Sequence, residues 1–312
     1  MKKKILIIGG AGYIGTELSN YLVKKGHNVD CYDTFWFGNF LNKKIKKIKG
    51  DVRKLNHKIF KNKDIVINLA YLSNDPLCEI NARDTWESGP LATYQMMEAC
   101  VQHRVKKFIF ASSGSIYGLK KEKKVTESLG LDPITDYNKS KMICEKVIQN
   151  YKNKLKTVIL RPATVCGASN RLRLDVVLNL FCYQAYYKKK INILGGKQIR
   201  PLLHIKDMIR AYDFFIKNNM TGTYNVGFEN VNVRKIANNV KKIIPSKIII
   251  KKSNDPRSYR MNSDKLIKIG FRQMYNHIDA INDLKKMFDK GFKPSLKNWN
   301  LKLLLKNKII TK

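Results

Sequence analysis

A glycine-rich turn near the N-terminus constrains the fold of this chain more than any other feature. Residues 4–8 form a short apolar segment typical of a buried strand, and Gly9, Gly12 and Gly15 follow it directly before a predicted helix over 16–25. Glycines at these places allow a tight turn and let the backbone approach a pyrophosphate, which the positive end of the helix stabilises. The pattern therefore predicts the first unit of a dinucleotide-binding domain.

An acidic residue after the second predicted strand indicates which dinucleotide is bound. Residues 28–32 form that strand, and Asp33 follows it. A carboxylate at this place accepts hydrogen bonds from an adenosine ribose and repels a 2′-phosphate. NAD is therefore predicted as the cofactor, in preference to NADP.

Strand-like and helix-like segments alternate through the first half of the chain, which predicts an α/β fold with a Rossmann-type doubly wound parallel sheet. A long helical region over 85–102 is expected to be interrupted near Gly89 and Pro90. Further strands are expected at 44–49, 64–69, 107–112 and 157–161.

Beyond Pro162 the alternation becomes irregular, which suggests a second and smaller lobe. Helices are expected over 175–187 and 206–217, and strands at 191–194 and 223–226, the last returning to the main sheet. We therefore expect a Rossmann domain over 1–165 that residues 201–227 rejoin, a C-terminal substrate-binding lobe over 166–200 and 228–296, and a basic tail over 297–312.

A tyrosine and a lysine one helical turn apart are the candidate proton-transfer pair. Tyr137 and Lys141 stand at i and i+4, so their side chains share one face of a predicted helix. A nearby ammonium favours the tyrosinate, which lets a phenol with an ordinary pKa near ~10 act as a base closer to neutral pH. The same spacing is common on surface helices, so its meaning depends on the other motifs.

Composition excludes several other classes of protein. A chain of 312 residues with 44% hydrophobic residues can build a large core, and it has no apolar run near the ~20 residues that span a bilayer. The six cysteines are scattered, without the cysteine and histidine spacing of a zinc site. We expect free thiols, no bound metal and a cytoplasmic protein.

The formal net charge of +37 has two interpretations. It is typical of proteins that bind nucleic acid or an anionic membrane, but it also follows if lysine simply fills most solvent positions. The lysines are spread over many predicted elements, which favours the second interpretation. The tail over 297–312 mixes lysines with Trp299 and several leucines, and we expect it to dock on its own protein or a partner subunit rather than on a membrane surface.

Taken together, the motifs resemble those of the extended short-chain dehydrogenases/reductases, specifically the nucleotide-sugar epimerase/dehydratase family that includes UDP-glucose 4-epimerases. The resemblance covers residues 3–290. It depends on motifs that occur in the family's order: Gly9-x-x-Gly12-x-x-Gly15, Asp33, Gly50-Asp51-Val52, Asn68-Leu69-Ala70, Ala111 to Gly118, Tyr137-x-x-x-Lys141, Arg161-Pro162 and Arg200 to Asp207.

The resemblance implies a role for each matching residue. In the catalytic group, Ser113 is the hydroxyl that assists, Tyr137 is the acid/base, and Lys141 lowers the pKa of the tyrosine and holds the nicotinamide ribose. The implied cofactor-binding residues are Gly9, Gly12, Tyr13, Ile14, Gly15, Asp33, Asp51, Val52, Leu69, Ala70, Tyr71, Tyr137, Lys141 and Pro162. The implied substrate-binding residues are Ser113, Thr164, Arg171, Arg173, Arg200, Arg257 and Tyr259.

Two departures from the family pattern limit the chemistry that the resemblance implies. Family 4,6-dehydratases carry Asp-Glu directly after the catalytic hydroxyl, whereas Gly114 and Ser115 stand here, and neither can eliminate water. The decarboxylase branch also needs a glutamate at position 115. In addition, the asparagine usual beneath the active-site helix is replaced near Gly89 and Pro90, so we expect the packing there to differ from that of the family.

The stretch from Arg161 to Asp175 resembles a subgroup found with surface-polysaccharide genes, which includes C4-oxidising enzymes acting on GDP-heptose. In it, Arg171 and Arg173 either grip the substrate diphosphate or are solvated residues at the start of a helix.

The resemblance therefore implies an NAD-dependent nucleotide-sugar 4-epimerase or C4 dehydrogenase, working as a homodimer without a specific nucleic-acid partner. The alternatives are an NADPH-dependent keto-sugar nucleotide reductase, against which Asp33 argues, and a non-catalytic RNA-binding or scaffold relative. The retained Ser113, Tyr137 and Lys141 argue against the second alternative.

Overall fold

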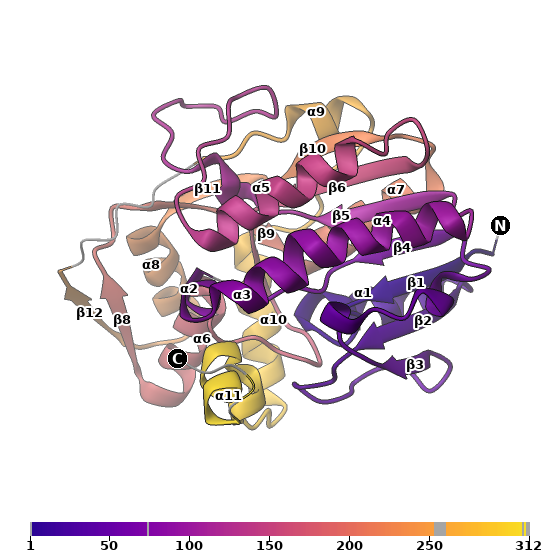
Figure 1. Cartoon of the computed structure of the whole chain (residues 1–312). Coiled ribbons are helices and arrows are strands. Elements are labelled where there is room, and N and C mark those ends of the chain that lie inside the picture. Colours follow the sequence, from indigo (N-terminus) through magenta and orange to yellow (C-terminus); the bar gives the residue numbers. More distant parts are fainter. Residues whose placement is uncertain (1, 74, 253–259, 308, 310–312) are drawn as a thin grey trace.

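The computed structural model describes residues 2–73, 75–252, 260–307 and 309 (Figure 1). The strands in this part of the chain are β1 (Lys4–Ile8), β2 (Asn28–Asp33), β3 (Lys46–Lys49), β4 (Ile65–Asn68), β5 (Lys107–Ala111), β6 (Lys156–Pro162), β7 (Thr164–Cys166), β8 (Lys190–Leu194), β9 (Ile199–His204), β10 (Gly222–Val226), β11 (Glu229–Asn232) and β12 (Lys247–Lys251). The α-helices are α1 (Tyr13–Lys24), α2 (Asp75–Ile80), α3 (Ala82–Trp86), α4 (Ala92–Gln102), α5 (Asp136–Gln149), α6 (Val177–Lys188), α7 (Ile205–Lys217), α8 (Val233–Ile243), α9 (Asp264–Lys268), α10 (His277–Asp289) and α11 (Asn300–Lys306).

The main sheet has the strand order β10-β6-β5-β4-β1-β2-β3, and all of its neighbouring strands are parallel. This order confirms the predicted Rossmann-type doubly wound fold. The order reverses between β1 and β4, and in such sheets ligands bind at the carboxyl ends of the strands next to that reversal. The fold therefore directs attention to the residues that follow β1, β2 and β4.

Alternating side chains of the central strands enter two different hydrophobic cores. Ile5 and Ile7 of β1 pack in the core that α1 and α7 cover, whereas Leu6 and Ile8 pack in the core that α4 and α5 cover. The two layers of helices on either side of the sheet are visible in Figure 1. Because both faces are buried, these strands are continuous apolar runs rather than alternating ones.

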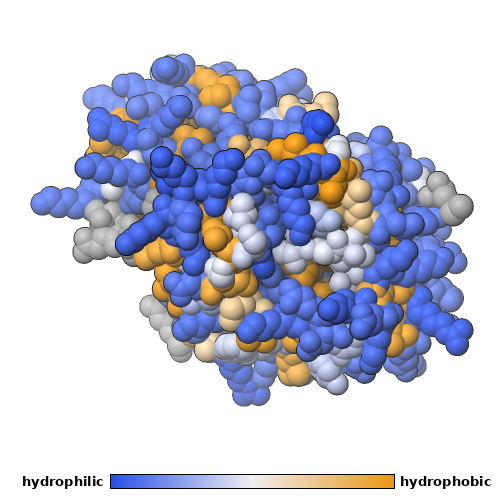
Figure 2. All heavy atoms as spheres, turned by 90° about the horizontal axis from the view of Figure 1, so that it is seen from above, coloured by the Kyte–Doolittle hydropathy of each residue, from blue (hydrophilic) through white to orange (hydrophobic). Residues whose placement is uncertain are grey.

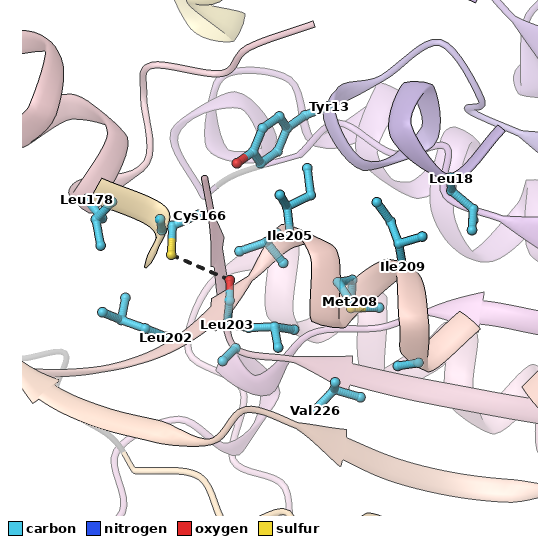
Figure 3. Packing of buried hydrophobic residues seen from close by; sticks show 14 of the residues in the cluster. Tyr13, Leu18, Cys166, Leu178, Leu202, Leu203, Ile205, Met208, Ile209 and Val226 are labelled. Carbon is cyan, nitrogen blue, oxygen red and sulfur yellow. Dashed lines mark hydrogen bonds between the residues drawn. The ribbon is translucent and has the colours of Figure 1, made fainter. Parts of the chain in front are cut away.

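The smaller lobe shares a core with the main sheet. It contains the three-stranded sheet β11-β9-β7 and the parallel pair β12-β8. Side chains of the lobe, such as Cys166, Leu178 and Leu202, belong to the same buried cluster as Leu18 of α1 and Met208 of α7 (Figure 3). Because the core is continuous, the lobe is packed firmly against the main sheet.

The long helical region is interrupted near Gly89 and Pro90, as the sequence predicted, and the interruption is a π-helical turn. Residues Glu87–Leu91 form a π-helical turn that joins α3 to α4 without a break in direction. A wider turn tolerates Pro90, which has no N–H to donate, and such π-turns are frequent at functional sites. Gly89 is buried within the turn.

The C-terminal segment docks on its own protein. Leu303 and Leu304 of α11 are buried in a small cluster with Leu72, Leu77 and Cys78. This is one of the two placements expected for the tail, and apolar contact explains it. Among the described residues, no helix has the length and apolar character needed to cross a membrane.

Hydrophilic side chains cover most of the face shown in Figure 2, and hydrophobic residues form only scattered islands on it. This distribution agrees with lysine filling solvent positions.

Candidate active site

A cavity lies where the fold predicts a ligand, at the carboxyl ends of β1, β2 and β4. Residues from distant parts of the sequence meet there, including Ala111 at the end of β5 and Asn300 of α11. Most of the cofactor-binding residues predicted from the sequence line this cavity: Gly9, Gly12, Tyr13, Ile14, Gly15, Asp33, Asp51, Val52, Leu69, Ala70 and Tyr71.

The glycine turn is shaped so that no side chain fits between it and the neighbouring backbone. Gly9 has φ +80°, and a Cβ atom on it would lie 2.5 Å from the Ala70 nitrogen. A Cβ on Gly15 would lie 2.3 Å from the Gly9 carbonyl oxygen. The helix α1 begins at Tyr13 with no side chain capping it and no acidic residue in its first turn. Its first N–H groups are therefore available to an anion, as a bound pyrophosphate requires.

Asp33 is held in place by backbone groups. Its carboxylate accepts hydrogen bonds from the Ala11 nitrogen at 2.9 Å and from the Phe35 nitrogen at 2.8 Å. Burial raises the pKa of Asp33, while these N–H groups oppose the shift. Loop residues on both sides thus orient the carboxylate at the cavity, which suits recognition of a ribose.

Arg53 orients the carboxylate of Asp51 at the far end of the cavity. Its guanidinium contacts Asp51 at 2.7 Å and also pairs with Asp84. Burial opposes ionisation of Asp51, but hydrogen bonds from Arg53 hold the pKa of Asp51 below its ordinary value. Neither Arg53 nor Asp84 was identified from the sequence, because no motif marks a residue that acts only by pairing with Asp51.

The structure brings Ser113 and Tyr137 together. Ser113 lies between β5 and a short 3₁₀ turn, where its hydroxyl hydrogen-bonds to that of Ser115 at 2.7 Å and is near enough to the Tyr137 phenol to favour the ionised phenol. Helix α5, which carries Tyr137, begins with a side-chain cap from Thr135. Tyr137 packs edge-to-face against Tyr71 of the cavity wall, with ring centroids 5.5 Å apart. A hydroxyl and a phenol therefore lie near each other beside the cavity.

Lys141 lies on the same face of α5 but is directed at other groups. Its ammonium donates to the Ala111 carbonyl at 2.6 Å and lies 3.7 Å from the centroid of the Tyr71 ring. It is 6.0 Å from the centroid of the Tyr137 ring. Burial lowers the pKa of Lys141 to about 8.

The sequence predicted a lowered pKa for Tyr137, and this prediction is wrong when only the protein's own side chains act on the phenol. Burial raises the pKa of Tyr137 above its ordinary value, and Cys78 and Asp75 add to the shift, whereas the nearby Ser113 hydroxyl opposes it. Burial dominates because a phenolate is poorly solvated there, and Lys141 is turned toward Ala111. A further positive charge is needed for the tyrosinate to form near neutral pH.

Tyr71 occupies the space left by Gly89 in the π-turn. A Cβ on Gly89 would lie 2.5 Å from the Tyr71 hydroxyl. That hydroxyl hydrogen-bonds to Ser140, and the ring is the surface on which Lys141 rests. The Tyr71 side chain thus fills the space that a larger residue at position 89 would occupy.

Replacing Gly89 with Ala is expected to lower turnover about 10- to 100-fold, because displacing Tyr71 moves the surface that positions Lys141. Steady-state rates with the nucleotide sugar that is turned over, and melting temperatures, measure the effect. Gly130→Ala is the matched control, since a Cβ at Gly130 meets nothing within 4 Å. Equal rates for both variants would contradict this role of Tyr71.

The remaining predicted residues lie elsewhere or outside the described part of the chain. Thr164 is half-buried in β7, and Arg200 lies on the neighbouring strand β9, so both are on the lobe side and neither lines the cavity. The Pro162 carbonyl lies 3.1 Å from where a Cβ of Gly114 would be, next to Ser113. Arg257 and Tyr259 lie outside the described residues.

Arg171 and Arg173 are not solvated residues. Both line the cofactor cavity, and Arg171 is only 2% exposed. The sequence reasoning did not identify Trp36, Phe37, Asn300 and Leu304, which also line it. Trp36 and Phe37 could have been proposed from the sequence, because they follow shortly after Asp33, whereas no neighbouring motif indicates a role for Asn300. The described residues contain no group of three or more histidine, cysteine, aspartate or glutamate side chains that could hold a metal ion.

Comparison with known proteins agrees with this geometry. An uncharacterised UDP-glucose epimerase of Bacillus subtilis (strain 168) is 31% identical over 261 residues, which cover 77% of this chain and 82% of the relative. A dTDP-D-glucose 4,6-dehydratase of Dictyostelium discoideum is 31% identical over 255 residues, covering 72% of this chain and 58% of the relative. The solved structure of a UDP-glucuronic acid 4-epimerase from Bacillus cereus, in complex with UDP-glucuronic acid and NAD, is 26% identical with a TM-score of 0.84, covering 93% of this chain and all of that one.

The family model described as "NAD dependent epimerase/dehydratase family" matches residues 5–227, which span the glycine turn, Asp33, Ser113, Tyr137 and Lys141. A match over more than half of the chain, together with a site that fits a dinucleotide, settles the classification. The chain belongs to the NAD dependent epimerase/dehydratase family.

Proposed function

We propose that this protein is an NAD-dependent nucleotide-sugar 4-epimerase or C4 dehydrogenase. The observation that carries the proposal is the position of Tyr137, which packs against Tyr71 of the cavity wall with the Ser113 hydroxyl nearby, beside a cavity lined by the glycine turn and Asp33. The relatives named above act, by their names, on UDP- or dTDP-sugars. That supports a nucleotide sugar as the substrate class.

In the proposed reaction, Tyr137 accepts the proton of the sugar C4 hydroxyl. Ser113 donates a hydrogen bond to the same oxygen and stabilises its developing charge. The chemistry that bound NAD supplies is acceptance and return of the C4 hydride, and its cationic ring provides the positive charge that the tyrosinate needs. Return of the hydride to the opposite face gives an epimer, whereas release of the keto sugar gives net dehydrogenation.

Elimination of water is not supported by this site. A Cβ on Gly114 would lie 2.4 Å from the Met261 sulfur and 3.1 Å from the Pro162 carbonyl, so an acidic side chain there needs rearrangement. Ser115 hydrogen-bonds to Ser113 and Asn138 and has no acidic function. The site thus argues against 4,6-dehydratase chemistry despite the similarity to a dehydratase.

We propose further that the enzyme is a cytoplasmic homodimer in surface-polysaccharide biosynthesis. Apolar side chains at Leu91, Tyr94 and Val101, along α4 and the turn before it, are exposed. A partner subunit that covers this face would bury them, which supports a dimer contact through α4 and its neighbour α5.

Incubation with NAD and a panel of UDP-, GDP-, dTDP- and CDP-sugars tests the proposal. We expect turnover of at least one sugar, with NMR showing inversion at C4 or mass spectrometry showing a product lighter by two hydrogens. NAD should bind at least about 10-fold more tightly than NADP, because Asp33 repels a 2′-phosphate. Tighter binding of NADP, or no turnover of any sugar in the panel, would contradict the proposal.

A further inference from the structure

Arg171 is a buried cation with an unpaired donor. Its side chain is 2% exposed, its guanidinium lies 4.0 Å from the Phe37 ring centroid, and one terminal nitrogen donates to the Asn300 side chain. Its Nε is buried and has no hydrogen-bond partner among the described residues. A buried guanidinium with unmatched donors is costly, and an anion that accepts from it removes the cost.

The two carboxylates whose charges act on Arg171 are already engaged. The Asp175 carboxylate pairs with Arg173 at 2.6 Å, and the Asp33 carboxylate accepts from two backbone N–H groups. Arg173 adds a second positive charge to the cavity wall. The field in this part of the cavity therefore favours an incoming anion.

The loop that carries Arg171 is tied to the start of α1. Ser169 donates to the Tyr13 carbonyl at 3.2 Å, and the Asn170 nitrogen donates to Glu17 at 2.7 Å. The Tyr13 hydroxyl in turn donates to the Gly167 carbonyl at 2.7 Å. These contacts hold the arginine loop against the uncapped N-terminus of α1, and both line one cavity.

The C-terminal segment holds the same loop from the other side. The Asn298 side chain donates to the Leu172 carbonyl at 2.8 Å, and the Leu174 nitrogen donates to the Asn298 carbonyl at 2.8 Å. Asn300, at the start of α11, contacts both Arg171 and Ser73. The segment that contributes Asn300 is anchored by the buried Leu303 and Leu304.

We propose that Arg171 binds the pyrophosphate of the cofactor, opposite the glycine turn, and that Asn300 of the C-terminal helix is its positioning residue. The proposal rests on the proposed NAD-dependent function. A diphosphate is the shared chemistry of cofactor and substrate. We favour the cofactor because Arg171 lines the cavity with Gly9, Gly12 and Asp33, whereas Thr164 and Arg200 on the lobe side do not line it.

Calorimetric titration of the full-length protein with NAD tests this assignment. Arg171→Met is expected to weaken NAD binding about 10- to 100-fold, and Arg171→Lys should weaken it less. UDP titrated into Arg171→Met that is saturated with NAD should bind within about 2-fold of its affinity for the wild-type protein, because Arg171 is assigned to the cofactor and not to the substrate. Arg83→Met, which removes an 86% exposed arginine, is the control and should change neither affinity.

Asn300→Ala is expected to weaken NAD binding about 3- to 10-fold in the wild-type background and to have no effect in the Arg171→Met background. That non-additivity separates positioning of Arg171 from a general structural role, because a destabilised helix would weaken binding in both backgrounds. Unchanged NAD affinity in Arg171→Met, or a loss confined to UDP, would overturn the assignment. Failure of the wild-type protein to bind NAD at all would instead refute the proposed function.

Discussion

Replacing Tyr137 with Phe is expected to reduce turnover of the nucleotide sugar about 10²- to 10⁴-fold, which is the usual contribution of a positioned acid/base group. The substitution removes only the phenolic oxygen, and the ring keeps its edge-to-face contact with Tyr71. NAD binding should therefore stay within about 2-fold of wild type, since the glycine turn and Asp33 are untouched. Single-turnover rates and calorimetric titration measure the two effects separately.

Two further variants make the result specific. Ser113→Ala should lower turnover less than Tyr137→Phe, because the serine assists the tyrosine but does not carry the proton in the proposed reaction. Tyr94→Phe removes a hydroxyl from a 51% exposed tyrosine and should leave turnover unchanged. Activity of Tyr137→Phe near that of Tyr94→Phe would refute Tyr137 as the acid/base.

Replacing Arg161 with Met is expected to lower the free energy of unfolding by about 3–5 kcal/mol, because it leaves a buried carboxylate without its partner. Arg161 and Glu145 are 4% and 1% exposed. The guanidinium contacts Glu145 at 2.6 Å and Tyr117 at 2.7 Å, and the same network includes Ser112. The network joins β5, β6 and α5 directly behind Ser113, so urea denaturation of the variant should show the loss.

The matched control is Arg83→Met, whose partner Glu87 lies one helical turn away on the surface. Solvent screens exposed pairs of this kind, so the control should unfold almost like the wild type. The double variant Arg161→Met with Glu145→Met should recover much of the lost stability, because no unpaired charge stays buried. A loss for Arg161→Met no larger than that of the control would contradict the role assigned to this ion pair.

Local patterns were sufficient for the scaffold of the site. The glycine turn, the apolar strands and the position of Asp33 predicted the Rossmann-type sheet, and the cavity is lined by nearly all of the expected cofactor residues. These features depend on neighbours in sequence, since a turn, a strand and a helix start are specified within a few residues. The spacing of Tyr137 and Lys141 likewise placed both on one face of α5.

The burial of the Tyr137 phenol, and therefore the direction of its pKa shift, could not be predicted in the same way. The spacing of Tyr137 and Lys141 suggested a phenol with a lowered pKa, but burial raises the pKa of Tyr137. Burial depends on what packs around the helix, and Tyr71 and the small Gly89 decide that packing together. Neither residue signals this role by its own sequence context.

The sequence by itself determined the fold class and the family, because both are encoded in short-range patterns, and the same patterns nominated Ser113 and Tyr137 as the reacting groups of the proposed function. Only the tertiary structure decided that Arg171 lies in the cofactor cavity and that Asn300, 129 residues away, contacts it. Such pairs form when a terminal helix buries leucines against a distant surface. That burial is a property of the assembled core, and no local pattern specifies which surface the helix will cover.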